Sequence, residues 1–308
     1  MTERTRTVAA FIRLGRPQFL LGGVVFHALG AAVAAHGGAA VDVVRFVVAQ
    51  LVVTATQLGT HYANDFFDLE ADRGNRTPTR WSGGSRVLPA GLLPPEAALA
   101  AAAALYGVAS GLVIALAVSL PERPFILPLG VVMIGLAWFY SAPPLRLCAR
   151  GLGEITTAVV VTLCVPLWGA YLPAGRLDSM LPWVIALPFA LQLAMLVAIE
   201  FPDAAGDVLA GKRTLVVRRG APAAARLYAT VTLAGFGLLP LGVAAGMPLA
   251  VALAALALAP IGVWQSLRVV RVGYGDPARW ASVAFWSVAL VAGAGIAELT
   301  ALVMSLGG

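Results

Sequence analysis

Nine long apolar runs are the feature that most constrains how this chain folds. A hydrocarbon core of about 30 Å requires roughly 20 apolar residues for one helix to cross it. The runs cover residues 18–35, 43–63, 96–119, 124–141, 153–172, 180–200, 223–245, 247–267 and 281–304. Because 60% of the 308 residues are hydrophobic and only 12% are charged, a soluble enzyme and a disordered chain are excluded. The sequence predicts an all-α polytopic membrane protein with nine transmembrane helices in one domain, residues 1–308.

The basic residues lie between these runs and are divided unevenly between the two sides. With the N-terminus inside, 18 of the 21 lysines and arginines fall on the cytoplasmic side, and only Arg45, Arg123 and Arg176 fall on the other. Such an excess marks cytoplasmic loops. We therefore expect a cytoplasmic N-terminus in the inner (cytoplasmic) membrane of the cell. The net charge of +6 then reflects orientation in a lipid bilayer, and nucleic acid is not an expected partner.

The acidic residues are scarce and gather at the ends of two runs. Both groups have the spacing i, i+3, i+7: Asp65, Asp68 and Asp72 end the second run, and Glu200, Asp203 and Asp207 end the sixth. At about 100° per residue, this spacing places the three side chains on one helical face. Four helices separate the equivalent runs, which suggests an internally duplicated four-helix unit with a ninth helix added.

These carboxylates predict a metal and phosphate site at the cytoplasmic face. Carboxylates at membrane depth are costly and are retained for function. Two facing acidic groups repel each other unless cations lie between them, and Mg²⁺ is commonly shared between carboxylates and substrate phosphates. Lys212, the only lysine of the chain, follows the second group and offers further positive charge to a phosphate. Solvated helix ends are the alternative, but they do not explain one spacing used twice.

Three segments resemble motifs of the UbiA superfamily of intramembrane prenyltransferases. Residues 64–72 (NDFFDLEAD) resemble its NDxxDxxxD motif. Residues 203–207 (DAAGD), continued by 211–215 (GKRTL), resemble its DxxxD motif. Residues 140–154, which begin YSAPPLR and end GLGE, resemble its loop between helices four and five. Their order on nine apolar runs extends the resemblance over the whole chain.

The resemblance implies nine helices around a central cavity, open sideways to lipid, that binds a polyprenyl diphosphate through two Mg²⁺ ions. It places the metal ligands at Asn64, Asp68, Asp72, Asp203 and Asp207, with Asp65 in support. The four aspartates among these ligands, together with Lys212, are the expected catalytic residues. The expected diphosphate contacts are Arg16, Lys212, Arg146 and Arg86.

Three further residues are candidates for roles beside the metal site. The ring of Tyr140 lies in a motif and has a face that stabilises an allylic cation. Glu200 is interpreted either as a base toward an acceptor hydroxyl or as an added metal or supporting carboxylate. His61, one turn before Asp65, is a candidate contact to diphosphate or acceptor, or a packing residue. Pro202 is expected to kink the sixth helix beside the site.

The acceptor expected from the resemblance is 1,4-dihydroxy-2-naphthoate, as in menaquinone biosynthesis. Residues 84–94 and 211–218 resemble the branch of the family that prenylates it. That branch carries asparagines and an arginine before its second motif, whereas this chain has residues 199–202 (IEFP) there. A terpene cyclase of the same family and a prenyltransferase for another lipophilic acceptor therefore remain open. A transporter is disfavoured because both acidic groups lie on one side of the membrane. Prenyl length and oligomeric state do not follow from the sequence.

Overall fold

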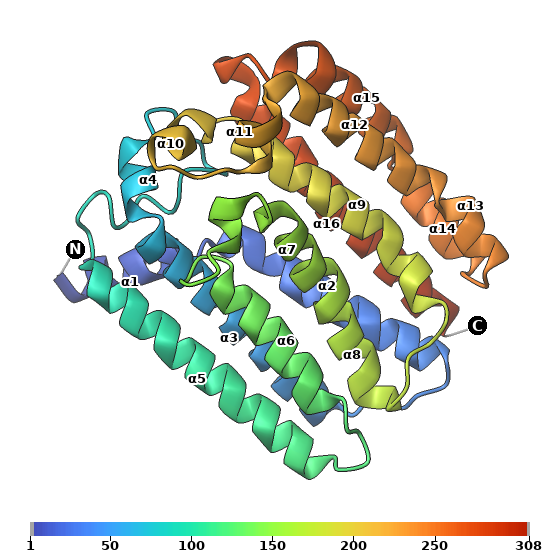
Figure 1. Cartoon of the computed structure of the whole chain (residues 1–308). Coiled ribbons are helices and arrows are strands. Elements are labelled where there is room, and N and C mark those ends of the chain that lie inside the picture. The colour runs from blue at the N-terminus through green and yellow to red at the C-terminus, as the bar shows by residue number, and fades with distance from the viewer. Residues whose placement is uncertain (1–2, 307–308) are drawn as a thin grey trace.

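Long helices lying side by side make up the molecule, as Figure 1 shows. The structure is a computed structural model that describes residues 3–306, and over that range it contains helices and loops but no strand. The elements, in chain order, are α1 (Glu3–Leu14), α2 (Pro17–His36), α3 (Val43–Phe67), α4 (Leu69–Gly74), α5 (Pro95–Ser119), α6 (Ile126–Phe139), η1 (Leu147–Arg150), α7 (Gly153–Val159), η2 (Val160–Cys164), α8 (Val165–Ala174), α9 (Leu181–Glu200), α10 (Ala204–Leu209), α11 (Leu215–Arg219), α12 (Ala221–Gly237), α13 (Leu239–Ala244), α14 (Leu249–Leu256), α15 (Ala259–Arg268), η3 (Val269–Gly273) and α16 (Pro277–Ser305).

The expected membrane spans coincide with helical stretches to within a few residues. Within residues 3–306, eight stretches are long and apolar enough to cross a membrane. The remaining expected run, 124–141, forms the shorter apolar helix α6 of 14 residues. The chain is therefore a multi-pass, all-helical membrane protein, as predicted. The suggested four-helix duplication stays a prediction.

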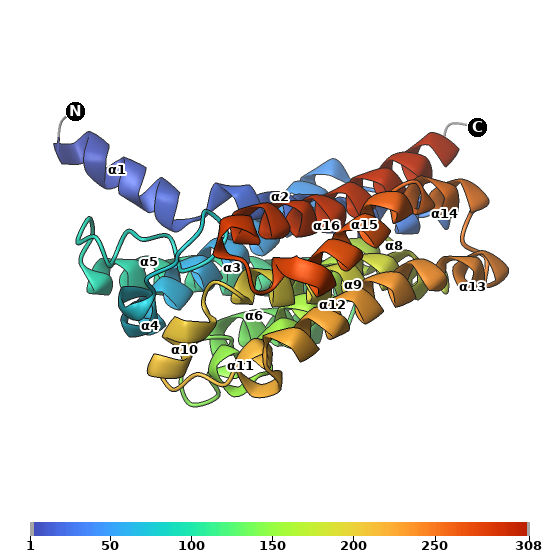
Figure 2. The same ribbon diagram turned by 90° about the horizontal axis from the view of Figure 1, so that it is seen from above.

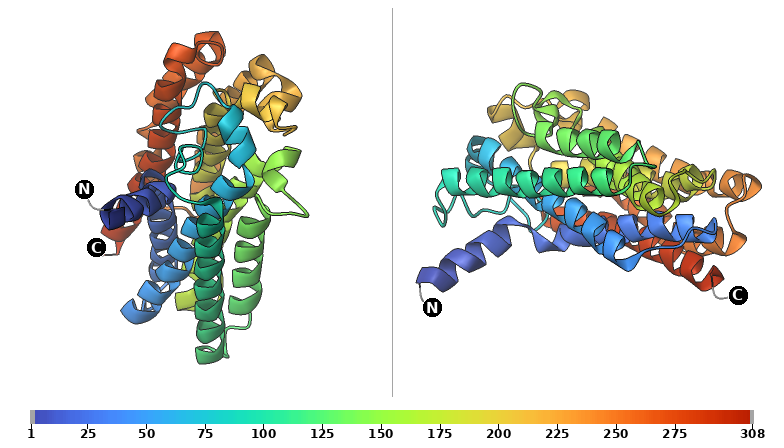
Figure 3. Two further views of the ribbon diagram at one scale, coloured as in Figure 1. Left: turned by 90° about the vertical axis from the view of Figure 1, so that its left-hand side faces the viewer. Right: turned by 90° about the horizontal axis from the view of Figure 1, so that it is seen from below.

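The helices close into a ring around a central cavity. Helix α2 packs against α8 and α16, and α9 packs against α16 and α12, so that the first and last long helices meet. Viewed from above and from two further sides, α1 projects away from the bundle at the end where α4 and α10 lie (Figures 2 and 3). Residues of α2, α3, α6, α7, α9 and α16 line the cavity.

A close crossing of α2 and α8 holds one wall of this ring. A Cβ on Gly30 would overlap the backbone of Pro166, and Gly169 meets the backbone of His27 in the same way. Small residues allow helix backbones to approach closely in lipid, where hydrophobic burial gives little drive for association. The fully buried ring of Trp168 fills the space beside this crossing and donates through its Nε1 to the Ala49 carbonyl, 3.3 Å away.

Both acidic segments lie where a long helix gives way to a short one. Helix α3 passes into α4 through a turn at Asp68, and the Asp72 N–H still donates to the Asp68 carbonyl across that turn. Helix α9 ends at Glu200, and Pro202 lies between it and α10; the expected kink is therefore a break between two helices, since proline has no N–H with which to continue the helix. Helices α4 and α10 contact each other at one end of the bundle (Figure 1). The two acidic segments therefore face each other.

Candidate active site

Two cavities meet at the end of the bundle where α4 and α10 lie. One, of about 100 Å³, is lined by both acidic segments and by the loop after α4. The other, of about 240 Å³, extends between the long helices and has mainly apolar walls. Five residues line both cavities and mark the junction: Arg16, Asn64, Tyr140, Leu196 and Ile199. A charged head and an apolar tail of one substrate would be accommodated on either side of this junction.

The first acidic segment presents three side chains to the polar cavity. Asn64, Asp68 and Asp72 line it, each four residues from the next, as one helical face requires. Asp65 was expected to share that face but lies behind it, fully buried. Its carboxylate pairs with Arg16 and accepts hydrogen bonds from the backbone N–H and the hydroxyl of Ser85. The structure thus separates Asp65 from the other two aspartates of its group.

The second acidic segment faces the first across the polar cavity. Glu200, Asp203 and Asp207 all line this cavity, as their shared spacing predicts. Lys212 bridges the two segments, with its Nζ 2.7 Å from Asp68 Oδ2 and 3.6 Å from Asp207 Oδ1. The lysine follows α10 directly, and its backbone N–H donates to the Asp207 carbonyl, which fixes where its side chain begins.

The loop after α4 clamps Asp203 from the other side. Asn75 Nδ2 donates to Asp203 Oδ1 at 2.7 Å, and the Gly83 N–H donates to Asp203 Oδ2 at 3.0 Å. Thr77 adds a hydrogen bond from its hydroxyl to the Pro202 carbonyl, 2.9 Å away. These bonds join segments about 120 residues apart in the chain and fix the orientation of this carboxylate before any ligand enters.

Arg16 closes the junction between the two cavities. It precedes Pro17 and has φ 47° and ψ 63°, a left-handed conformation that is unusual for a residue other than glycine. Its guanidinium pairs with Asp65 and donates through Nη2 to Asn64 Oδ1, 3.1 Å away. The Gly15 carbonyl accepts a bond of 2.6 Å from His61 Nδ1, which holds the same turn. Arg16 Nε is buried without a partner among the described residues and is available to an anion.

The other expected site residues are placed less centrally. Tyr140 lines both cavities, whereas His61 lines only the apolar one. Arg86 is half-buried, and its Nη1 is bound to the Asp72 carbonyl. Arg146 is exposed, and neither it nor Arg86 lines either cavity. The structure therefore brings Arg16 and Lys212 to the acidic groups, but not the other two arginines.

Burial raises the pKa of three aspartates in the polar cavity, Asp72, Asp203 and Asp207. Loss of solvation raises the pKa of Asp72 to about 7, although Arg16 opposes the shift. Loss of solvation likewise raises the pKa of Asp203 to about 6, against the stabilising Gly83 hydrogen bond, and it also raises the pKa of Asp207. Burial by itself would lower the pKa of Lys212, but the nearby Asp68, Cys148 and Asp207 together raise it above its usual value, so the lysine is charged. Added positive charge would keep these acids ionised.

The oxygen atoms of this cavity fit a hard cation that is shared with a ligand. Among residues 3–306, no three His, Cys, Asp or Glu side chains form a group that could hold a metal ion by themselves. Asp68 Oδ1 and Asp72 Oδ2, however, are buried and have no hydrogen-bond partner in the described structure. Mg²⁺ is typically held by one or two carboxylates while phosphate oxygens and water complete its shell. The residues present therefore fit Mg²⁺ bound together with a phosphate-bearing substrate.

Several residues of the site were not predicted from the sequence. Ser141 accepts a hydrogen bond from Asn64 Nδ2 at 3.0 Å, while Ser85 and Asn75 hold Asp65 and Asp203. Ser141 and Ser85 lie in segments that resemble family motifs, and this resemblance could have indicated both residues. Asn75 continues the helical face of Asn64 and Asp72, but nothing in its local sequence indicates a partner on the second acidic segment.

Comparison with known proteins agrees with this architecture. The model of the UbiA prenyltransferase family matches residues 24–293. A 1,4-dihydroxy-2-naphthoate octaprenyltransferase of Mycobacterium leprae is 30% identical over 190 residues, which are 62% of this chain and 63% of that enzyme. A digeranylgeranylglyceryl phosphate synthase of Thermococcus gammatolerans is 29% identical over 242 residues, 77% of this chain and 80% of that one.

A solved structure shows the same fold. The structure of a UbiA homologue from Archaeoglobus fulgidus bound to DMAPP and Mg²⁺ superposes with a TM-score of 0.65 at 14% identity, covering 94% of this chain and 98% of that one. The family match spans most of the helices that form the ring and both acidic segments. This chain belongs to the UbiA prenyltransferase family.

Proposed function

We propose that this chain is an Mg²⁺-dependent transferase that moves a polyprenyl group from its diphosphate to an aromatic acceptor, 1,4-dihydroxy-2-naphthoate, within the membrane. The junction of the acidic cavity with the apolar cavity carries this proposal, because a prenyl diphosphate has one end suited to each. We assign the activity to a single domain over residues 1–308.

The relatives support both the donor and two kinds of acceptor. The M. leprae enzyme is named for an aromatic acceptor, 1,4-dihydroxy-2-naphthoate. The A. fulgidus structure is bound to DMAPP, an allylic diphosphate, and Mg²⁺. The T. gammatolerans enzyme is named for a glycerol lipid product, and its match covers the larger share of both chains. A glycerol lipid is therefore the second candidate acceptor.

The roles follow from where each side chain lies. We assign the two Mg²⁺ ions to Asn64, Asp68, Asp72, Asp203 and Asp207, which face one another across the polar cavity. When bound, Mg²⁺ supplies positive charge to the diphosphate oxygens as the allylic C–O bond breaks. Lys212 and Arg16 are the protein's own cations in this cavity, and we assign them to the same diphosphate.

The proposed transfer is a substitution at the prenyl C1 atom. The C1–O bond breaks and its electron pair leaves with the diphosphate, while an electron pair of the acceptor ring forms the new C–C bond. The ring proton leaves to a base, for which we assign Glu200, because its Oε2 is buried without a partner among the described residues. The apolar walls exclude water from the allylic cation, and Tyr140 at the junction offers it an aromatic face.

We place this end of the bundle at the cytoplasmic side of the inner membrane. Arg73, Arg76 and Arg80 lie in or near the loop that lines the polar cavity, and Arg218 and Arg219 follow the second acidic segment. Positively charged loops of this kind stay in the cytoplasm. Labelling of single cysteines introduced at Arg76 and Arg176 from outside intact cells tests this orientation, since only the second is expected to react.

Diphosphate release tests the proposed reaction. Purified protein is given geranylgeranyl diphosphate and Mg²⁺, with and without 1,4-dihydroxy-2-naphthoate, and the products are identified by mass. We expect release that depends on the acceptor, together with a prenylated naphthoid product. Release without acceptor, giving a hydrocarbon or an alcohol, would assign the chain to the cyclases of the family. Release that instead requires geranylgeranylglyceryl phosphate would identify the glycerol lipid as the acceptor.

Lys212→Ala should raise KM for the prenyl diphosphate roughly 10- to 30-fold, because a charged hydrogen bond to a buried anion is lost. Steady-state kinetics with varied donor measures the effect. Arg213→Ala is the matched control, because Arg213 is the neighbouring cation but is exposed and lines neither cavity. An unchanged KM in Lys212→Ala would remove this lysine from the diphosphate site.

A further inference from the structure

The hydroxyl of Thr214 belongs to the polar cavity. Thr214 is 6% exposed, lies two residues after Lys212, and lines the polar cavity but not the apolar one. Its Oγ1 is buried and has no hydrogen-bond partner among residues 3–306. The hydroxyl lies near enough to Asp207 to oppose the rise in the pKa of that carboxyl, but it makes no hydrogen bond of ordinary length to it. A buried hydroxyl of this kind is costly unless a ligand satisfies it.

The local structure does not use this hydroxyl. Thr214 is the N-cap residue of α11, a position where a threonine side chain usually accepts a hydrogen bond from the first turn of the helix. Here the side chain makes no such bond. Glu154 on α7 instead accepts a hydrogen bond from the Leu215 N–H, at the start of the same helix. The Thr214 hydroxyl is therefore left for the cavity.

Backbone hydrogen bonds hold the segment around Thr214 in place. The Lys212 N–H donates to the Asp207 carbonyl at 2.8 Å, and the Arg213 N–H donates to the Ala149 carbonyl at 2.9 Å. Together with the bond from Leu215, these contacts anchor the residues on both sides of Thr214. The position of the hydroxyl is thus fixed before a ligand enters, which lowers the entropy lost on binding.

The unpartnered atoms of the polar cavity are of two kinds. Asp68 Oδ1, Asp72 Oδ2 and Glu200 Oε2 are carboxylate oxygens, which a cation or a proton satisfies. Arg16 Nε and Thr214 Oγ1 carry hydrogens to donate, and both are unpartnered among the described residues. Cations bound between the carboxylates would therefore leave these two donors for the oxygens of an anion.

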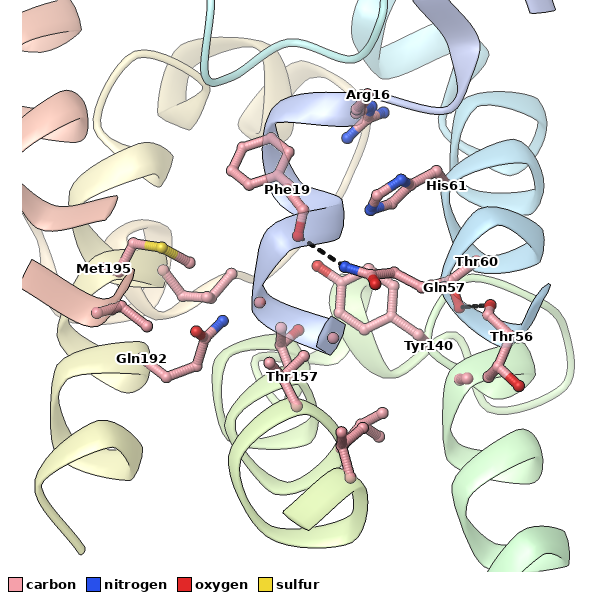
Figure 4. A pocket seen from close by; sticks show the side chains of 18 of the residues that line it. Arg16, Phe19, Thr56, Gln57, Thr60, His61, Tyr140, Thr157, Gln192 and Met195 are labelled. Atoms are coloured by element: carbon pink, nitrogen blue, oxygen red, sulfur yellow. Dashed lines mark hydrogen bonds between the residues drawn. The ribbon is translucent and has the colours of Figure 1, made fainter. Parts of the chain in front are cut away.

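The two donors lie at different distances from the apolar cavity. Arg16 lines both cavities, whereas Thr214 lines only the polar one. Figure 4 shows Arg16 at one end of the apolar cavity, above Phe19 and His61. A prenyl chain that fills the apolar cavity brings its C1 atom to this end, so the phosphate attached to C1 meets Arg16. The second, terminal phosphate then extends further into the polar cavity.

We propose that the Thr214 hydroxyl donates a hydrogen bond to the terminal phosphate of the prenyl diphosphate, and so favours a diphosphate over a monophosphate. This inference rests on the proposed prenyl transfer and deepens it, because it gives the terminal phosphate a contact of its own. A hydrogen bond to a charged phosphate oxygen is stronger than one between neutral groups, so its loss is measurable.

The variant Thr214→Val tests the contact by removing the hydroxyl with little change in volume. Calorimetry at saturating Mg²⁺, without acceptor, should show a Kd for geranylgeranyl diphosphate raised about 10-fold and an unchanged Kd for geranylgeranyl monophosphate. Thr214→Ser keeps a hydroxyl and should bind both ligands as the wild type does. Thr232→Val is the matched control, because Thr232 Oγ1 is also buried and unpartnered among the described residues but lines neither cavity.

The two ligands separate a contact to the terminal phosphate from a general effect on the site. An equal loss of affinity for both ligands in Thr214→Val, or no loss for either, would overturn the proposal. An affinity that returns when Mg²⁺ is raised further would show that the hydroxyl serves Asp207 and its metal ion, and would also overturn it. A wild-type protein that binds neither ligand would instead refute the proposed donor class, so the two failures are distinguishable.

Discussion

Asp68→Asn and Asp203→Asn should each lower kcat for prenyl transfer by roughly 1,000-fold, because each removes a charge that holds Mg²⁺ against the leaving diphosphate. The two residues lie on opposite walls of the polar cavity, so the effect should appear from either side. Both variants should remain folded. The raised pKa of Asp203 shows that its burial already disfavours the charged form, and a neutral amide avoids that cost. Diphosphate release at saturating Mg²⁺ measures kcat, and thermal unfolding in detergent checks the fold.

Glu298→Gln is the matched control for removal of a buried carboxylate. Glu298 on α16 is fully buried, and both of its carboxylate oxygens lack partners among the described residues, yet it lines neither cavity. This variant should keep full activity. If Asp68→Asn or Asp203→Asn behaves like Glu298→Gln, the proposal of two metal ions held between the acidic segments fails.

The membrane helices were predictable because their cause is local. A helix in lipid satisfies its backbone hydrogen bonds within itself and carries mainly apolar side chains. The hydropathy of the sequence therefore identifies each membrane-spanning helix. Pro202 was expected to kink the sixth helix, but α9 ends before it, at Glu200, and a separate helix follows. The spacing of the second acidic group also predicted correctly that its three side chains point the same way, because Glu200, Asp203 and Asp207 all line the polar cavity.

The contacts that orient these acids were not predictable from local pattern. The spacing of the first group placed Asp65 with Asp68 and Asp72, but Arg16 and Ser85 hold Asp65 behind the cavity and Asn64 takes its place. These partners lie 49 and 20 residues away in the chain. Hydrogen bonds between distant segments depend on how the bundle closes, and no periodicity encodes them. Arg146 was likewise expected at the site, but it is exposed and lines neither cavity.

Gly84→Ala should lower kcat roughly 100-fold without unfolding the protein. Gly84 has φ +72°, and a Cβ at this position would overlap the carboxylate of Asp72. The side chain of Asp72 would have to move away, and a displacement of about 1 Å at a positioning group can cost about 100-fold in rate. Because Asp72 is an assigned metal ligand, the Mg²⁺ concentration for half-maximal rate should rise in the same variant.

Gly91→Ala separates this contact from backbone strain. Gly91 lies in the same loop and has φ +65°, but a Cβ there would meet nothing within 4 Å. Both variants therefore carry the cost of a left-handed alanine, about 1–2 kcal/mol, and only Gly84→Ala also disturbs Asp72. Gly91→Ala should lower the unfolding temperature slightly and keep wild-type kcat and Mg²⁺ dependence. Equal kinetics for the two variants would mean that the loop does not position Asp72, and that this carboxylate is held by α4 alone.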